Sequence, residues 1–270
     1  MNTIKMTEIS KEIVEIRLNR PQALNALTHE LIGEVITTFS GINKNRDIRV
    51  VILTGEGKGF CAGADLKQAA GPGDIPGTEG MGHLGFVYKF QEYLMEAILA
   101  IHECEKPVIA AVNGVAVGGG LALVLASDLR IASTSASFGS VFIKTGLSSC
   151  DVGTSYFLPK YVGPTKALEL MLTGRIFSAD EAHRLGLLNA IVTPDQLIKE
   201  SVKLAMEISG NSEYGVWMTK KGFWTNLDAL SLRHAMELEN RQQVLGCFTG
   251  CMEEAMTAFV EKRPPKWKKL

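Results

Sequence analysis

Two glycine-containing stretches could stabilise negative charge through backbone amides rather than through side chains. The first is GKGFCAGADLKQ, residues 57–68, and the second is NGVAVGGGLALVLAS, residues 113–127, in which a predicted strand runs through three glycines into a predicted helix. Amides of a first helical turn have no acceptor within the helix, so they can face an anion or an oxygen that becomes negative during a reaction. The structural alternatives are tight packing of the glycines and helix capping by Asp65.

Composition and charge limit the class of protein and its partners. The chain has 270 residues, 46% of them hydrophobic, with 28 basic and 29 acidic residues mixed along it, so we expect neither nucleic acid nor an anionic membrane as a partner. Residues 1–11 lack the apolar segment of a secretory signal, and glycines interrupt the most apolar stretch, 108–126. The five cysteines show no metal-binding spacing. We therefore expect a cytoplasmic protein without a bound metal.

The elements that would position the two glycine stretches alternate between strand and helix, which predicts an α/β fold. Thr28 and Ser178 are predicted helix N-caps, and the chain from residue 163 onward is mostly helical in pattern. Residues 69–85, rich in glycine, are expected to form a long loop, either a pocket wall or an excursion without function. Strands are predicted within residues 12–21, 49–57, 106–114 and 189–193, and long helices within 26–44 and 87–105.

Taken together, the motifs resemble those of the crotonase, or enoyl-CoA hydratase/isomerase, superfamily. The resemblance covers nearly the whole chain in order: NRPQALNAL, GKGFCAGADLK, KPVIAAVNGVAVGGGLALVLASDLRIAS, ASFGSVFIKTGLSSCDVGTSYFLPKYVG, LTGRIFSADEAHRLGLLNAIV and AFVEKRPPKW. It implies a core, residues 1–195, in which β-β-α turns wind as a superhelix, and a helical region, 196–270, used for trimerisation. It also implies an acyl-CoA thioester as substrate, no separate cofactor, and a homotrimer or homohexamer.

The resemblance also implies roles for particular residues. The backbone amides of Ala64 and Gly119 would form an oxyanion hole for the thioester oxygen. The alternative to CoA binding for Lys67 is an ordinary lysine in solvent. For Phe259 and Lys262 the alternative is a C-terminal amphipathic helix with Phe259 in the core and Lys262 in solvent. The positions implied to contact CoA are Gln22, Ala23 and Leu24 at the adenine, Ala62, Asp65, Leu66 and Lys67 along the arm, and Phe259 and Lys262, sometimes from a neighbouring subunit.

The chain departs from the family pattern at the two glutamates with which hydratases activate water. Ala122 and Phe142 occupy these positions, and neither can accept a proton. Asp151, in GLSSCDVGTSYFLPK, resembles the aspartate of dienoyl-CoA isomerases and of ring-opening phenylacetate-pathway isomerases, in a turn one residue longer than in the dienoyl-CoA enzymes. Its alternative is a helix N-cap.

A single carboxylate suits isomerisation, because one group can take a proton from one carbon and return it to another. We expect Val141, Phe142 and Leu147 to keep water from Asp151 and so to raise its pKa. The predicted activity is double-bond isomerisation of an enoyl-CoA with Asp151 as proton shuttle. A hydratase that uses Asp151 alone and a catalytically silent acyl-CoA-binding protein are the alternatives.

Overall fold

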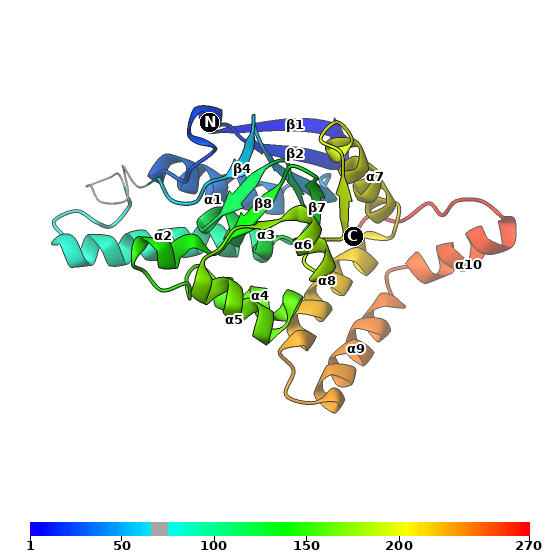
Figure 1. Ribbon diagram of the computed structural model, residues 1–270. Coiled ribbons are helices and arrows are strands. Elements are labelled where there is room, and N and C mark those ends of the chain that lie inside the picture. Colours follow the sequence, from blue (N-terminus) through cyan, green and yellow to red (C-terminus); the bar gives the residue numbers. More distant parts are fainter. Residues whose placement is uncertain (66–74) are drawn as a thin grey trace.

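The computed structural model describes residues 1–65 and 75–270 and contains two sheets surrounded by helices (Figure 1). This confirms the predicted α/β class. In the larger sheet β1 and β2 are antiparallel and all other neighbours are parallel, in the order β1-β2-β3-β5-β7-β10. Its strands are β1 (Ile4–Ser10), β2 (Ile13–Leu18), β3 (Val50–Gly55), β5 (Val108–Val112), β7 (Leu129–Ser133) and β10 (Ala190–Val192). The smaller sheet, β4-β6-β8-β9, has the strands β4 (Gly59–Cys61), β6 (Val115–Val117), β8 (Ser137–Gly139) and β9 (Phe177–Ser178).

Successive strands alternate between the two sheets before the chain enters a helix. The chain passes from β3 to β4 and later into α2, from β5 to β6 and into α3, and from β7 to β8 and then through η2 to α4. This is the β-β-α turn that the resemblance implies. The helices are η1 (Pro21–Ala23), α1 (His29–Lys44), α2 (His83–His102), α3 (Gly119–Ala126), η2 (Val141–Thr145), α4 (Thr154–Val162), α5 (Pro164–Thr173), α6 (Ala179–Arg184), α7 (Leu197–Ser209), α8 (Glu213–Leu227), α9 (Leu232–Gly246) and α10 (Cys251–Glu261).

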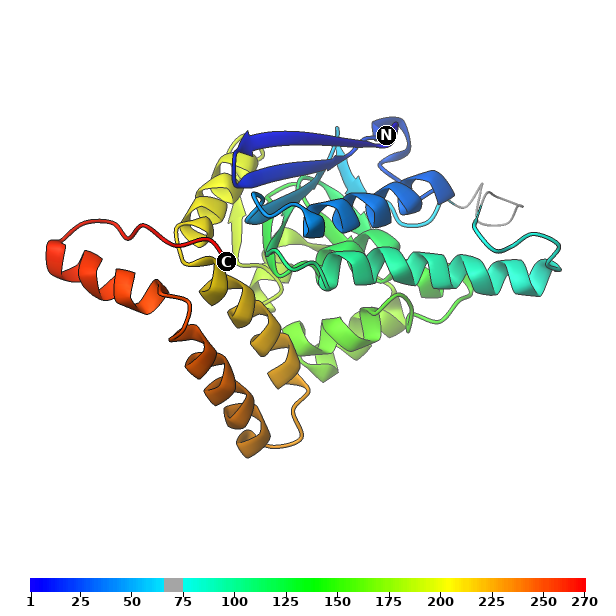
Figure 2. The same cartoon turned by 180° about the vertical axis from the view of Figure 1, so that it is seen from behind.

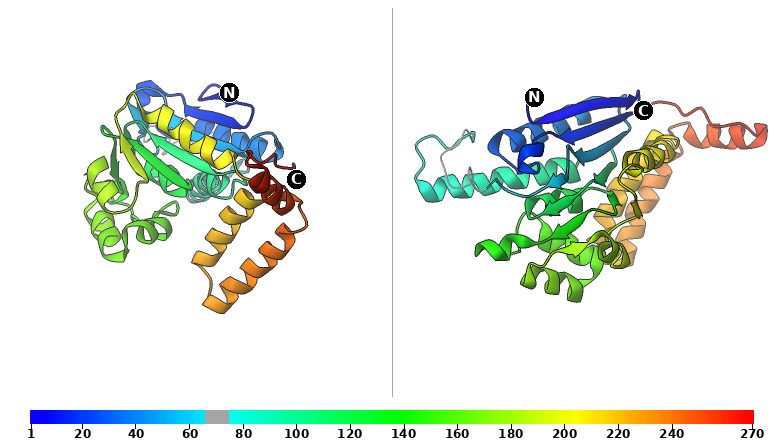
Figure 3. Two further views of the ribbon diagram at one scale, coloured as in Figure 1. Left: turned by 90° about the vertical axis from the view of Figure 1, so that its right-hand side faces the viewer. Right: turned by 45° about the horizontal axis from the view of Figure 1, so that its top comes forward.

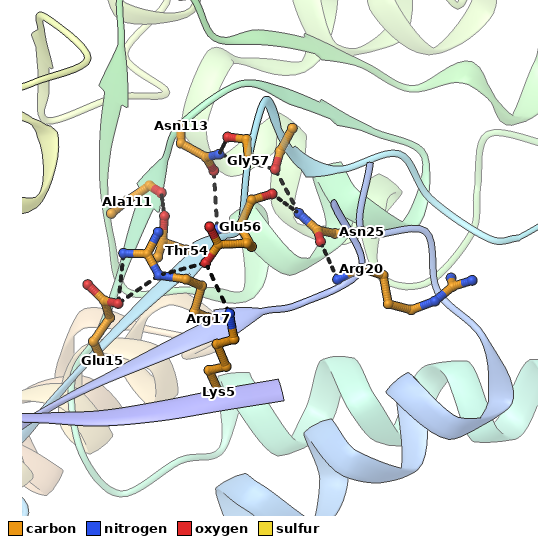
Figure 4. Close-up of polar contacts among 12 residues, drawn as sticks. Lys5, Glu15, Arg17, Arg20, Asn25, Thr54, Glu56, Gly57, Ala111 and Asn113 are labelled. Carbon is orange, nitrogen blue, oxygen red and sulfur yellow. Dashed lines mark hydrogen bonds and ion pairs between the residues drawn. The ribbon is translucent and has the colours of Figure 1, made fainter. Parts of the chain in front are cut away.

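Side-chain amides close the corners at which the chain changes sheet (Figure 4). Asn113 accepts a hydrogen bond from the backbone N–H of Gly55 at 3.1 Å and donates to the carbonyl of Gly57 at 2.9 Å. The fully buried Asn25 donates to the carbonyl of Glu56 at 3.0 Å. These bonds satisfy backbone groups that the corner removes from strand pairing. The same corner carries ion pairs among Lys5, Glu15, Arg17 and Glu56.

Both faces of the central strands β3 and β5 of the larger sheet are buried, which explains their continuous apolar runs. Val51 and Leu53 of β3 point into the core that includes α1, α2 and α3, whereas Val50 and Ile52 pack toward Leu197 of α7. Figure 3 shows α7 lying along one face of the sheet, and Figure 2 shows α1 and α2 side by side on the other side of the molecule. The sheets therefore form a rigid support for the loops at their ends.

The local predictions hold with one boundary error. Thr28 accepts a hydrogen bond from the N–H of Leu31 at 3.2 Å, and Ser178 accepts one from Glu181 at 3.2 Å, so both N-caps are confirmed. The predicted loop 69–85 is too long, because α2 begins at His83. The first part of that loop lies outside the described residues.

The C-terminal helices α8, α9 and α10 extend away from the sheets (Figures 1 and 2). A buried ion pair attaches α8 to the core: Lys220 Nζ lies 2.7 Å from Asp128 Oδ2, and the two side chains are 7% and 13% exposed. Trp224 also donates to Asp128, at 3.0 Å. In the described parts of the chain, no helix is both long enough and apolar enough to span a membrane.

Candidate active site

The two glycine stretches meet at one place between the sheets and α3. Strands β4 and β6 pair in parallel, which brings the residues that follow them side by side. A Cβ built on Gly119 would lie 3.9 Å from the backbone nitrogen of Ala64, and one built on Gly63 would lie 3.3 Å from the nitrogen of Gly119. The backbone amides of Ala64 and Gly119 are therefore close neighbours, which is the arrangement that the resemblance implies.

In the part of the chain that the structure describes, both amides are left for a ligand. Ala64 pairs with Leu27 in an isolated β-bridge. In this bridge the N–H of Leu27 donates to the carbonyl of Gly63 and the N–H of Asp65 donates to the carbonyl of Leu27, so the N–H of Ala64 takes no part. Gly119 is the first helical residue of α3, where an N–H has no intrahelical acceptor. Within residues 1–65 and 75–270, neither amide is bonded to an acceptor. Two such donors at one point can stabilise a negative oxygen.

The three glycines of the GGG run, residues 118–120, have different structural roles. A Cβ on Gly120 would lie 2.0 Å from the carbonyl oxygen of Cys61, so only glycine lets α3 lie against β4. Gly118 has a φ of 54°, in the left-handed region that favours glycine. Tight packing, offered above as an alternative, is thus correct for Gly120, while Gly119 presents its amide.

The two positions of the missing hydratase glutamates are filled by apolar side chains. Ala122 is fully buried in α3. Phe142, in η2, lies beside the glycine turn, with its Cε1 atom 3.8 Å from the Cβ position of Gly118 and with Val141 Cγ2 at 3.6 Å from the same point. These side chains offer no group that can exchange a proton.

Asp151 lies in the turn between η2 and α4. The predicted alternative, a helix N-cap, is wrong: α4 begins at Thr154, and its N-cap is Gly153. Burial raises the pKa of the Asp151 carboxyl, while hydrogen bonds from the backbone of Val152 and from the side chain of Gln91 act in the opposite direction. A raised pKa is the direction that the sequence reasoning expects, although Leu147 is 62% exposed and therefore gives little shelter from water.

Sequence reasoning missed Gln91. Its Nε2 atom donates a hydrogen bond to Asp151 Oδ1 from α2, across 60 residues of sequence. It belongs to no motif, because the amphipathic pattern of α2 identifies only the buried face of that helix. Only the folded chain brings this amide to Asp151.

The structure brings together some of the residues implied to contact CoA. Gln22 and Ala23 lie in η1, and Leu24 follows with its carbonyl accepting the N–H of Ala62 at 3.0 Å. Asp65 forms an ion pair with Arg20 at 3.1 Å, which fixes its carboxylate beside this segment. Leu66 and Lys67 lie outside the described residues.

Phe259 and Lys262 are not near these residues within one chain. They lie in and directly after α10, which projects from the opposite side of the molecule to α2 (Figures 1 and 2). Phe259 is 86% exposed, so the alternative that places it in the core is wrong. Lys262 is exposed, as that alternative expects.

Other candidate groups do not add chemistry to the site. Cys61 is fully buried, and burial raises the pKa of its thiol to about 12, so a nucleophilic thiolate does not form there. Among the described residues, no three His, Cys, Asp or Glu side chains are grouped to hold a metal ion.

Comparison with known proteins gives the family over nearly the whole chain. The sequence model described as enoyl-CoA hydratase/isomerase matches residues 8–269. A probable enoyl-CoA hydratase, EchA12, of Mycobacterium tuberculosis is 40% identical over 255 residues, which cover 94% of this chain and 88% of the relative.

Solved structures agree with this result. A probable enoyl-CoA hydratase/isomerase from Mycobacterium abscessus matches with a TM-score of 0.92 and 36% identity over 99% of each chain. A monofunctional enoyl CoA isomerase from M. smegmatis matches with a TM-score of 0.73 and 34% identity, over 87% of this chain and 99% of that chain. By sequence and by fold, this chain belongs to the enoyl-CoA hydratase/isomerase family of the crotonase superfamily.

Proposed function

We propose that this protein is an enoyl-CoA isomerase that moves a carbon–carbon double bond of an acyl-CoA with Asp151 as its proton shuttle. The observation that carries the proposal is the contrast within one site. Two backbone donors that have no acceptor among the described residues, at Ala64 and Gly119, lie side by side, yet Ala122 and Phe142 replace the two carboxylates that hydration uses. Such a site can stabilise an enolate but lacks the usual means of activating water.

The chemistry needs one group that both accepts and returns a proton. The Asp151 carboxylate takes a proton from C2 of a 3-enoyl-CoA, and the electrons of the broken C–H bond move toward the thioester oxygen to give a dienolate. The amides of Ala64 and Gly119 hold that negative oxygen. The Asp151 carboxyl then returns the proton to C4, the double bond forms between C2 and C3, and the carboxylate is regenerated. The burial that raises the pKa of Asp151 brings the carboxyl closer to working pH, which favours this exchange.

Hydration is the second candidate, because the relative EchA12 carries the name of a probable enoyl-CoA hydratase. In that reaction Asp151 alone would activate a water molecule, which would add to a 2-enoyl-CoA. The third candidate is a catalytically silent acyl-CoA-binding protein, suggested by the two missing glutamates.

Substrate binding and assembly complete the proposal. Gln22, Ala23 and Leu24 would line the adenine site, with Ala62, Asp65, Leu66 and Lys67 along the CoA arm. The exposed apolar side chains on the C-terminal helices support self-association through region 196–270, as a homotrimer or homohexamer in the cytoplasm. In that assembly Phe259 and Lys262 of one subunit would reach the CoA of another. The exposed apolar side chains of this region include Met236, Val244 and Leu245 on α9, Phe248 between α9 and α10, and Met252, Met256, Phe259 and Val260 on α10.

Mass spectrometry in H₂¹⁸O separates the three candidates. The protein is incubated separately with a 3-enoyl-CoA and a 2-enoyl-CoA, and the products are analysed for double-bond position and for ¹⁸O. A shifted double bond without ¹⁸O supports isomerisation. Rapid incorporation of ¹⁸O into the 2-enoyl-CoA would establish hydration instead, and binding without any product would favour the silent protein. Sedimentation velocity of the same sample tests for the trimer or hexamer.

A further inference from the structure

We propose that Gln91 is a positioning residue for Asp151, whose carboxylate it holds in a fixed orientation through its side-chain amide. The inference rests on the proposed function, in which Asp151 exchanges the proton. Gln91 Nε2 donates to Asp151 Oδ1 from α2, whereas Asp151 itself belongs to the turn before α4. The two residues come from separate β-β-α turns, so their contact joins α2 to the turn before α4.

The location of Gln91 on α2 supports this role. Phe90 and Leu94 bury one face of the helix in the core. Leu84 and Tyr88, on the same helical face as Gln91, are exposed apolar side chains. A hydrogen-bonding amide in a largely apolar strip can solvate a neighbouring carboxylate.

The backbone after Asp151 also hydrogen-bonds its carboxylate. Val152 has a φ of 38°, a conformation that β-branched residues rarely adopt, and Gly153 follows with a φ of 79°. The N–H of Val152 interacts with the Asp151 carboxyl, and the carbonyl of Asp151 accepts the N–H of Thr154 at 2.8 Å. A strained turn and an amide from another helix thus restrain one carboxylate, which is the preorganisation that proton transfer needs.

Within the described part of the chain, Gln91 supplies the one side-chain hydrogen bond that affects the pKa of Asp151, and this bond lowers the pKa against the larger effect of burial. The charged neighbours of Gln91 on α2, Lys89 and Glu92, pair with each other at 2.6 Å. On the segment of Asp151, the neighbouring titratable groups are Lys144 and the Cys150 thiol, and neither contributes to this pKa. Because the amide of Gln91 favours the ionised carboxylate, its removal should raise the pKa of Asp151.

The test compares wild type with Gln91→Leu, Gln91→Met and Gln91→Glu. Leucine and methionine remove the donor, and we expect the acidic limb of the kcat/KM profile for a 3-enoyl-CoA to move up by about one pH unit. Glutamate places a second carboxylate beside the first and should move that limb further. The matched control is Glu96→Leu, which adds the same side chain at another exposed position of α2 and should leave the profile unchanged.

A second readout does not need turnover. The Asp151 carboxyl resonance of ¹³C-aspartate-labelled protein, assigned by its loss in Asp151→Asn, is titrated in wild type and Gln91→Leu. Movement of both the resonance midpoint and the kinetic limb supports the inference. An unchanged midpoint in Gln91→Leu and Gln91→Met overturns it. If the midpoint moves but wild type converts no 3-enoyl-CoA, the coupling of Gln91 to Asp151 stands and the proposed isomerase function fails.

Discussion

Replacing Gly119 by proline removes an amide donor, whereas replacing it by alanine keeps that donor and adds only a methyl group. Gly119 is the first residue of α3, a position that proline tolerates because its N–H has no intrahelical acceptor. Its φ lies outside the left-handed region that favours glycine. Both place a Cβ at 2.8 Å from Leu27 Cδ1, the flexible end of a side chain, and at 3.7 Å from Gly63 Cα. Only proline removes the N–H.

The expected loss in Gly119→Pro follows from the removal of one preorganised donor. Such a donor contributes about 2.7–4 kcal/mol to lowering the barrier, which corresponds to about a 100- to 1000-fold fall in kcat. The displacement of Leu27 is common to both variants, so Gly119→Ala should retain most of the activity. The assay measures kcat and KM for a 3-enoyl-CoA, with thermal melting as a check of folding. If the two folded variants agreed in kcat within about threefold, the assignment of this amide to the oxyanion hole would be refuted.

Three further outcomes test the structure itself. Burial raises the pKa of Asp151 in the folded protein, so ionisation of this carboxyl destabilises the folded state. Asp151→Asn should therefore raise the melting temperature at pH 7. This gain should disappear as the pH falls below 3.8, the ordinary pKa of an aspartate. A gain that did not depend on pH would contradict this cause. Lys220→Met leaves Asp128 buried without its cation and should cost about 3–5 kcal/mol in urea unfolding, whereas a loss below about 1 kcal/mol would mean that the pair does not anchor α8. Iodoacetamide should modify the exposed Cys150 and spare Cys61 until the protein unfolds, as peptide mass spectrometry can show; early labelling of Cys61 would be inconsistent with its full burial.

The parts of the fold that sequence could predict are those determined by short-range pattern. The apolar runs at β3 and β5 reflect burial on both sheet faces, and Thr28 and Ser178 cap helices through bonds three residues along the chain. The closeness of Ala64 and Gly119 was predicted from a resemblance, and the parallel pairing of β4 with β6 is its physical basis.

Long-range contacts of polar side chains could not be predicted in the same way. Gln91 meets Asp151, and Arg20 meets Asp65, only because the folded sheets bring distant turns together. The exposed position of Phe259 has a related cause. The apolar spacing of its helix is typical of a residue that is buried in the core of the same subunit. In the structure, α10 extends away from the sheets and leaves the Phe259 side chain exposed.

The central claim is that one carboxylate, Asp151, carries the proton in an isomerisation. The most direct measurement is the rate at which wild type and Asp151→Asn convert a 3-enoyl-CoA to the 2-enoyl-CoA, with binding of the substrate measured by calorimetry on both proteins. We expect wild type to convert it and Asp151→Asn to bind it equally well but to react about 100- to 10,000-fold more slowly. An Asp151→Asn protein that isomerised at the wild-type rate would contradict the claim.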